Sequence, residues 1–345
     1  MSETAALGLT THRQNNNLKS LLLLAAFPLL LAALVGFTFF FFGLLLLDAQ
    51  SPQEGFAVWG LTPVVQTGSA AADFGLAAVY AWWPLVFGAA AIWMLIGYFF
   101  NARIIRSATG AHPVDRTQEP RLYNLLENLC ISRGLITPRL HVIETEALNA
   151  FASGIDQKSY AVTVTRGLLL ELDDDELEAV LAHELTHIMG RDTRLLVITV
   201  VFVGMISFLA QMLWRMIGRV PLRGSKKGGA GAALLIGIAA VIFAIGYMLA
   251  LVLRFAISRR REYLADAGSV DMTKNPGAMI RALRKIAQKP HIPGVSSEAR
   301  QMFIENPPAR FSLGGLLATH PPVEKRIQIL EALGGDLPGP WTRKE

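Results

Sequence analysis

The chain has 345 residues, of which 52% are hydrophobic and only 17% are charged, and its mean hydropathy is +0.40. This composition excludes an ordinary water-soluble globular protein. The net charge is +5, but the basic residues stand beside long apolar runs, where they are typical of membrane flanks and not of a nucleic-acid-binding surface. A single cysteine, Cys130, excludes an intrachain disulfide and a cysteine-ligated metal site.

Two long uncharged runs in the first hundred residues predict transmembrane helices. Leu21 to Leu47 and Phe74 to Phe100 each exceed the ~20 apolar residues that a bilayer crossing needs. A cleaved signal peptide, the alternative for the first run, has an apolar core of only ~7–15 residues. Basic residues precede the first run and follow the second, and the loop between them has none. The positive-inside rule therefore predicts a cytoplasmic segment at 1–18, then two spans within 19–100 that are joined by an external loop at 48–73.

Residues 101–192 predict a soluble segment of mixed structure that lies in the cytoplasm. Glu119 to Arg133 carries apolar residues at helical spacing. Short strands are predicted at Leu140 to Glu144, Ala150 to Gly154 and Ser159 to Thr165. The segment therefore contains a small β-sheet as well as helices.

A helix that contains a HExxH motif follows these strands. Asp173, with a glutamate three residues later, forms a capping-box pattern that starts this helix. Residues four apart share one helix face, so His183 and His187 can direct their imidazole nitrogens to one zinc ion. Glu184 lies on an adjoining face, where it can take a proton from water without binding the metal. A histidine-rich helix surface is the alternative, but the apolar neighbours predict a buried helix, in which these polar groups need a partner.

A catalytic zinc ion needs a third protein ligand and one open position. The HExxHxxGxxH extension is absent, because residue 193 is threonine. A second segment, SRRREYLADAGS at 258–269, offers Glu262 as a ligand, with Asp266 one turn later to accept a hydrogen bond from a ligand histidine. An exposed acidic face that offsets Arg259 to Arg261, themselves interpreted as membrane flanks, fits the spacing equally well. From the residues alone, both interpretations stay open.

A membrane hairpin is predicted at residues 193–257. They hold apolar runs at 195–213 and 228–253, which bring the predicted transmembrane helices to about four. The loop between the two runs is strongly basic, so a full crossing would place positive charge outside, and the sequence leaves open whether the hairpin crosses fully. In either case 101–192 and 258–345 lie on the same face of the membrane, and we expect them to fold together as two parts of one domain.

The last part of the chain is predicted to be helical. Helices are expected at Arg259 to Ser269, from Asn275-Pro276 to about Gln288, and at Pro322 to Leu333, with a loop at 290–314. The predicted fold class is α+β: a mostly helical domain with a small β-sheet, together with membrane helices.

Four motifs, in this order along the chain, resemble the HtpX family of bacterial membrane zinc metalloproteases. They are LNAFASG at 148–154, LAHELTHI at 181–188, SRRREYLADAGS at 258–269 and THPPVEKRI at 319–327. The similarity to the CAAX-processing prenyl proteases of eukaryotes is more distant. The resemblance covers roughly residues 100–335, and the N-terminal spans match in layout only. Four motifs in one order are much more specific than HExxH alone.

The resemblance implies a zinc metalloprotease domain with one zinc ion per chain. It implies that the metal ligands are His183, His187 and Glu262, that Glu184 is the general base, and that Asp266 contacts a ligand histidine.

The resemblance also implies roles for residues that the pattern alone would not single out. It places His320 and Arg326 near the metal, where they stabilise the oxyanion of the reaction. Without it, His320 would be interpreted as a turn residue and Arg326 as a solvated helix charge. It further implies that Asn149, Ala150, Phe151 and Ala152 form an edge strand that receives the substrate backbone.

Together these inferences predict a membrane-bound zinc endopeptidase of a bacterial inner membrane, multi-pass, with its active site at the cytoplasmic face. Its expected partners are the lipid bilayer and protein or peptide substrates, above all damaged or misfolded membrane proteins, and no nucleic acid. One alternative is a processing protease for a single lipidated or C-terminal motif. Another is a non-catalytic membrane scaffold stabilised by zinc, against which the retained Glu184 argues. The sequence leaves the oligomeric state open.

Overall fold

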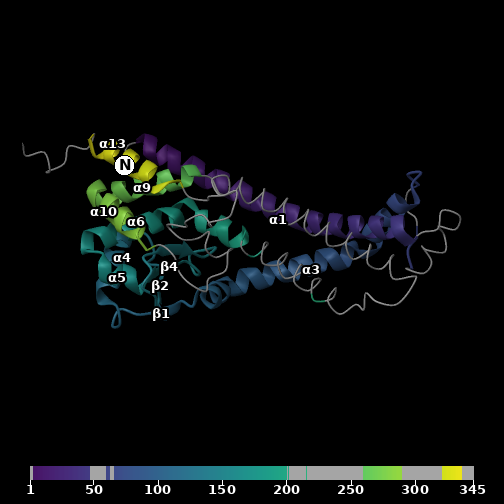
Figure 1. Ribbon diagram of the computed structural model, residues 1–345, viewed down its shortest axis with the longest axis horizontal. Helices are drawn as coiled ribbons and strands as arrows, with labels where there is room; N and C mark the ends of the chain where they lie inside the picture. Colours follow the sequence, from purple (N-terminus) through teal and green to yellow (C-terminus); the bar gives the residue numbers. More distant parts are fainter. Residues whose placement is uncertain are drawn as a thin grey trace, which may run out of the picture. The chain divides into compact units, whose positions relative to one another are not determined.

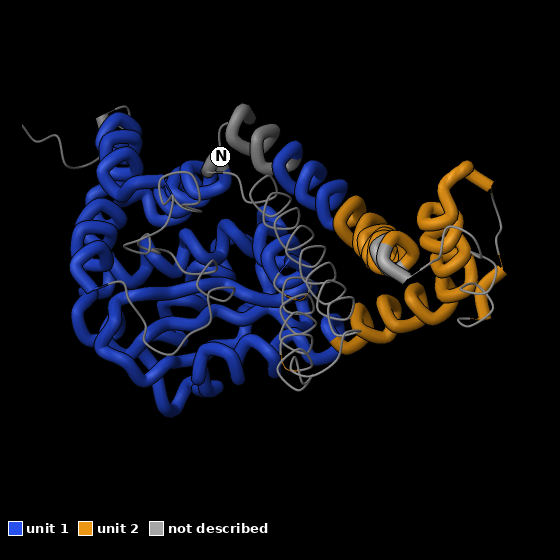
Figure 2. Tube along the Cα trace, turned by 45° about the vertical axis from the view of Figure 1, so that its right-hand side comes forward, with its two compact units in different colours: residues 1–20, 97–200, 254–345 blue, residues 21–96, 201–253 orange. Residues whose placement is uncertain are grey.

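The computed structural model describes residues 3–46, 60–62, 66–199, 259–289 and 321–335, with the single positions 201 and 215. The chain divides into two compact units, which Figure 2 shows in different colours. The first comprises residues 1–20, 97–200 and 254–345, and the second comprises 21–96 and 201–253.

Two long helices supply most of what is described of the second unit. They are α1 (Glu3–Leu46) and α3 (Ala70–Thr109), and both are long and apolar enough to cross a membrane. Only 11% and 17% of their most apolar windows are buried, so large apolar side chains such as Leu21 and Phe99 are exposed. Such continuous apolar exposure needs a non-aqueous environment. The predicted runs at 195–213 and 228–253 lie almost entirely outside the described residues.

Small residues allow α1 and α3 to approach closely within the second unit. A Cβ atom added at Gly75 would lie 2.7 Å from the backbone oxygen of Gly36, and one added at Gly43 would lie 2.7 Å from the Cα atom of Ala71. Contacts of this kind, in which the absence of a side chain lets two backbones meet, are typical of helix pairs in membranes.

The first unit contains a small mixed β-sheet. Its strands are β1 (His112–Val114), β2 (Arg139–Ile143), β3 (Ala150–Ser153) and β4 (Ala161–Thr165). Their order is β1-β2-β4-β3, with β2 and β4 parallel and the outer strands antiparallel to their neighbours. The three strands that the sequence predicted are confirmed within two residues. The sequence analysis missed β1, which has only three residues, a proline among them, and shows no apolar alternation.

Six helices of the first unit pack with this sheet around one apolar core, and Figure 1 labels them. They are α4 (Pro120–Arg133), α5 (Arg166–Glu171), α6 (Asp174–Gly190), α9 (Arg259–Thr273), α10 (Pro276–Ile286) and α13 (Val323–Gly335). The central helix is α6, which contacts α4, α9, α10 and the strands β3 and β4. The prediction of a mostly helical domain with a small sheet is confirmed.

The residues at the two ends of α6 determine where this helix begins and ends. Asp173 and Glu176 form the predicted capping box, in which each side chain accepts from the other residue's backbone N–H. At the other end, α6 stops at Gly190, and the next residue, Arg191, adopts a left-handed conformation (φ 59°). A Cβ atom at position 190 would lie 3.2 Å from the side chains of His12 and Asp192, which is a tight contact.

Candidate metal centre

The site depends on a close approach between α6 and α9. A Cβ atom added at Gly268 would lie 2.4 Å from Thr186 Oγ1, so α9 can pack against α6 only where it lacks a side chain. One residue later, Ser269 Oγ donates a hydrogen bond of 2.6 Å to the carbonyl oxygen of Ala179. This packing brings Glu262, near the start of α9, to the two histidines of α6.

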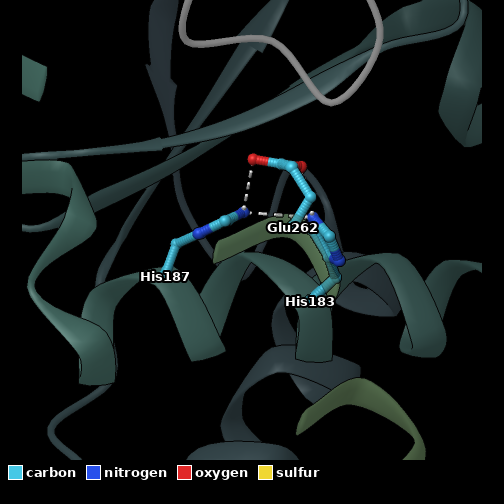
Figure 3. A group of neighbouring side chains, drawn as sticks. All are labelled: His183, His187 and Glu262. Carbon is cyan, nitrogen blue, oxygen red and sulfur yellow. Dashed lines mark hydrogen bonds and ion pairs between the residues drawn. The ribbon is translucent and has the colours of Figure 1, made fainter. Parts of the chain in front are cut away.

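Figure 3 shows His183, His187 and Glu262 converging on one point. Their candidate ligand atoms all lie within 4.8 Å of one another. The two Nε2 atoms are 3.1 Å apart, and the Glu262 oxygens lie 3.7 Å from His183 Nε2 and 3.8 Å from His187 Nε2. Two atoms that bind one tetrahedral zinc ion at ~2.0–2.1 Å lie roughly 3.3–3.4 Å apart. The observed separations bracket that value.

The carboxylates beside the two imidazoles support the same interpretation. His183 Nδ1 lies 3.0 Å from Asp266 Oδ1, and His187 Nδ1 lies 3.0 Å from Asp192 Oδ2. Each carboxylate therefore favours the tautomer that carries its proton on Nδ1. In the neutral rings both Nε2 lone pairs then face each other and the Glu262 carboxylate, and all three side chains are buried. Such an arrangement of buried acceptors fits a bound cation.

Asp266 connects His183 to a third element of the fold. The guanidinium of Arg326, on α13, donates to Asp266 Oδ2 at 2.8 Å and to Oδ1 at 2.6 Å, and both side chains are fully buried. Burial raises the pKa of Asp266, but Arg326 and then His183 outweigh it and lower that pKa to about 2. Burial likewise lowers the pKa of His183, but Asp266 and Glu262 outweigh it and raise that pKa to about 9. The site therefore favours positive charge at His183 Nε2.

Glu184 lies beside the three candidate ligands with only 2% of its surface exposed. Burial raises the pKa of its carboxyl above the ordinary value, and the two imidazoles offset part of this effect. The backbone N–H of Ala152, on β3, donates a hydrogen bond to the carboxylate. Glu184 therefore joins the candidate ligands to the edge strand.

The predicted substrate-binding strand is the outermost strand of the sheet beside α6. Ala150, Phe151 and Ala152 lie within β3 and are buried. Asn149, just before the strand, is fully buried, so it is not an exposed turn residue. Its backbone N–H donates to Thr165 Oγ1 at 3.0 Å, and its side-chain oxygen accepts from the N–H of Ala150.

The structure decides some of the alternatives left by the sequence. Glu262 has no exposed surface, so the interpretation of an exposed acidic face is wrong. Arg261, one of the three predicted membrane flanks, is 3% exposed, and its Nε atom lies 3.2 Å from Glu262 Oε1. Arg326 is buried and not a solvated helix charge. His320 lies outside the described residues.

Asp192 is a member of the site that was not predicted from the sequence. It lies at the start of a helical stretch at 192–199, and its carboxylate bonds to His187. A signal was available, because an acidic residue five positions after the second histidine of the motif comes just past the end of the same helix.

Comparisons with known proteins agree with this geometry. The family model described as peptidase family M48 matches residues 116–333, which is more than half of the chain. The chain belongs to peptidase family M48. A protease HtpX homolog of Bacteroides fragilis is 48% identical over 255 residues, which cover 72% of this chain and 79% of that protein. A protease HtpX homolog of Trichormus variabilis is 38% identical, over 73% of this chain and 86% of that protein.

A match to a solved structure is weaker. The crystal structure of S. mikatae Ste24p gives a TM-score of 0.43 at 17% identity and covers 73% of this chain and 58% of that chain. The M48 family, its HtpX relatives and the two apolar helices together identify the chain as a membrane metalloendopeptidase. Its substrates are accordingly peptides or proteins.

Proposed function

We propose that this M48 peptidase binds one zinc ion through His183, His187 and Glu262 and hydrolyses peptide bonds with Glu184 as the general base. The observation that carries the proposal is the convergence of the three buried ligand atoms within 4.8 Å. Three protein ligands leave a fourth position for water or substrate, as in other catalytic zinc sites.

When bound, the zinc ion would act as a Lewis acid on water and on the scissile carbonyl. Glu184 takes the proton of the attacking water and then transfers it to the leaving amine. Its raised pKa suits both steps, because a carboxyl with a higher proton affinity is a better base and still releases the proton to the amine. The N–H of Ala152 holds the carboxylate in one orientation during this exchange.

We propose, from the family resemblance, that His320 and Arg326 stabilise the negative charge that develops on the carbonyl oxygen. In the described part of the chain, Arg326 pairs with Asp266 through two hydrogen bonds. Its action on His183 through Asp266 is thus a second contribution, which orients a ligand.

The proposed substrate site is the edge strand that Asn149, Ala150, Phe151 and Ala152 form or adjoin. An extended peptide would add to the sheet at this edge and would pass the metal centre in one direction. The hydrogen bond from the backbone N–H of Ala152 to Glu184 supports this proposal, because it joins β3 to the proposed general base.

We further propose that the active site lies at the cytoplasmic face of a bacterial inner membrane. Lys19 before the first apolar run and Arg103 and Arg106 after the second support this orientation. The proposed layout has residues 1–18 in the cytoplasm, two spans within 19–100, a membrane hairpin at 193–257 that brings the spans to four, and a peptidase domain split between 101–192 and 258–345.

Quality control of damaged or misfolded membrane proteins is the proposed physiological role, because the site belongs to a membrane-anchored endopeptidase. A processing protease for one lipidated or C-terminal motif is the second candidate, and cleavage of unrelated unfolded substrates at many positions would exclude it. A zinc-stabilised scaffold is disfavoured by the retained Glu184 beside three candidate ligands, because a structural zinc site closes its fourth position with a protein ligand.

The decisive experiment compares Glu184→Gln with Glu178→Gln in purified full-length protein. Glu178 lies on the same helix and is half-buried, so it controls for the loss of one acidic group from α6. We expect Glu184→Gln to keep stoichiometric zinc and to lose cleavage of an unfolded membrane-protein substrate by at least ~100-fold, the lower range for general-base catalysis. Glu178→Gln should cleave at the parent rate. Full cleavage by Glu184→Gln, or parent protein without zinc, would refute the proposed chemistry.

A further inference from the structure

The carboxylate of Asp192 links one candidate metal ligand to a distant part of the chain. Its Oδ2 atom lies 3.0 Å from His187 Nδ1. Its Oδ1 atom is held by the N-terminal segment, where Asn16 Nδ2 donates at 2.7 Å and His12 Nε2 lies 2.9 Å away. Each carboxylate oxygen thus has its own partner, and the residues before the first apolar run contact the environment of the metal centre.

Asn16 fixes more than the carboxylate. Its amide also donates to the carbonyl oxygen of Gly190, the last residue of α6, at 3.0 Å. Its own backbone oxygen accepts a hydrogen bond of 2.8 Å from Ser20 Oγ. Asn16 and Asp192 are only 2% and 3% exposed, so water cannot replace a lost donor here.

The contact is built into the helix α1. His12 and Asn16 are four residues apart and therefore share one helix face. A neighbouring hydrogen bond of 2.8 Å, from Arg191 Nη1 to Asn17 Oδ1, also joins α1 to the end of α6. Gly190 permits the approach, because a Cβ atom there would lie 3.2 Å from His12 Cδ2.

These contacts bear directly on His187. An imidazole that is held at Nδ1 keeps one tautomer and one ring direction, and its Nε2 atom then points at one place. The hydrogen bond from His187 Nδ1 to Asp192 can fix the ring only if the Asp192 carboxylate is itself held in place. Charge-assisted hydrogen bonds to a buried carboxylate are among the stronger ones in proteins, so the donors on α1 restrict the rotation of Asp192.

We propose that Asn16 and His12 are positioning residues of the metal centre, which hold Asp192 against His187 and so fix the direction of the metal-facing nitrogen. The inference rests on the proposed function, because it requires a metal ion at His187 Nε2. It assigns the segment ahead of the first apolar run a role in the site, beyond that of a membrane flank.

The test uses full-length protein in detergent, loaded with zinc or with cobalt(II). Asn16→Ala is compared with Asn15→Ala, a matched change at an exposed neighbour on the same helix. We expect Asn16→Ala to lower metal affinity, measured by chelator competition, about 10–100-fold, the usual effect of removing an outer partner of a ligand histidine. It should also shift the cobalt absorption bands and lower kcat more than KM. Asn15→Ala should match the parent in all three measurements.

A double variant separates positioning from general stabilisation. If Asn16 acts through Asp192, adding Asn16→Ala to Asp192→Ala should cause no further loss of metal affinity. His12→Ala, at a partly exposed side chain, should weaken metal binding in the same direction but less, and it replaces Asn16→Ala if that variant does not fold.

Three outcomes would overturn the positioning role: parent-like affinity and cobalt spectrum in Asn16→Ala, equal losses in Asn15→Ala, or additive losses in the double variant. Failure of the proposed function would look different, because the parent protein itself would then bind no metal. If the parent protein binds metal and Asn16→Ala has the same metal affinity and cobalt spectrum, the positioning role is overturned and the proposed function is not.

Discussion

Replacing Gly268 with alanine tests whether the distance between α6 and α9 sets the metal centre. The added Cβ atom would lie 2.4 Å from Thr186 Oγ1, 2.5 Å from Thr186 Cγ2 and 3.0 Å from Thr186 Cβ. Carbon atoms in favourable contact are ~3.5–4.0 Å apart, so α9 would have to withdraw by roughly 1 Å. Glu262 lies on the same helix and would move away from the two histidines.

The expected cost follows from the size of that clash. Overpacking a well-packed interior typically costs about 1–3 kcal/mol. If this strain is relieved when the metal site opens, it lowers metal affinity by roughly 5–150-fold, because about 1.4 kcal/mol corresponds to a factor of ten. A ligand displaced by ~1 Å also reduces turnover, by up to ~100-fold. We therefore expect Gly268→Ala to lose both zinc affinity and activity.

The assay is zinc retention against a chelator, with peptidase activity measured on the same samples. Gly277→Ala, on α10, is the matched control, since its Cβ atom would meet only ordinary contacts at 3.6 Å. Thr186→Ala removes the two nearest atoms and should restore part of the loss when it is combined with Gly268→Ala. Parent-like zinc retention and activity in Gly268→Ala would refute the argument that this close approach positions Glu262.

Two further predictions concern buried groups. Arg326→Leu leaves the Asp266 carboxylate without its buried cation, which should cost about 3–5 kcal/mol of folding stability and should lower zinc content after dialysis. Reduced kcat with full zinc content and unchanged thermal stability would show that Arg326 acts on the oxyanion alone. Burial raises the pKa of Cys130 to about 11, so at pH 8 only about one thiol in a thousand is the reactive thiolate. Maleimide or iodoacetamide should therefore label this thiol far more slowly in the folded protein than in SDS, and labelling should accelerate as pH rises towards 11. Similar rates in the two states would contradict the burial.

Local patterns predicted the elements that depend on neighbours in the sequence. The capping box at Asp173 and the spacing of His183, Glu184 and His187 were sufficient to define α6, because helix periodicity alone places these side chains. The strands β2, β3 and β4 were also predictable locally, from short strand-like runs bounded by turn residues. The order β1-β2-β4-β3 was not, since strand pairing depends on contacts between distant residues.

The role of the candidate ligand Glu262 could not be decided from the sequence alone. By spacing it was as consistent with an exposed acidic face as with a metal ligand, and the difference is its complete burial. That burial arises from the contact of Gly268 with Thr186, which no local pattern encodes. The burial of Arg261 was likewise not predictable, because a basic residue beside an apolar run usually lies at a membrane surface.

The contacts of Asp192 with Asn16 and His12 could not be predicted from any local pattern. Asn16 and His12 are far from Asp192 along the chain, and neither belongs to a recognisable motif. A polar residue ahead of a membrane span is ordinarily solvated, so its burial against another helix is a purely tertiary effect. The part of the candidate site that the family motifs do not include is also the part that the sequence could not predict.

Because Glu262 comes from the chain beyond residues 193–257, the order of synthesis has a consequence for the cell. A ribosome completes His183 and His187 well before it reaches Glu262, so an unfinished polypeptide carries two imidazoles and no third donor. A product truncated before that glutamate would lack the proposed third ligand. On the proposed ligand set, peptidase activity begins only after residues 193–257 and Glu262 have been translated.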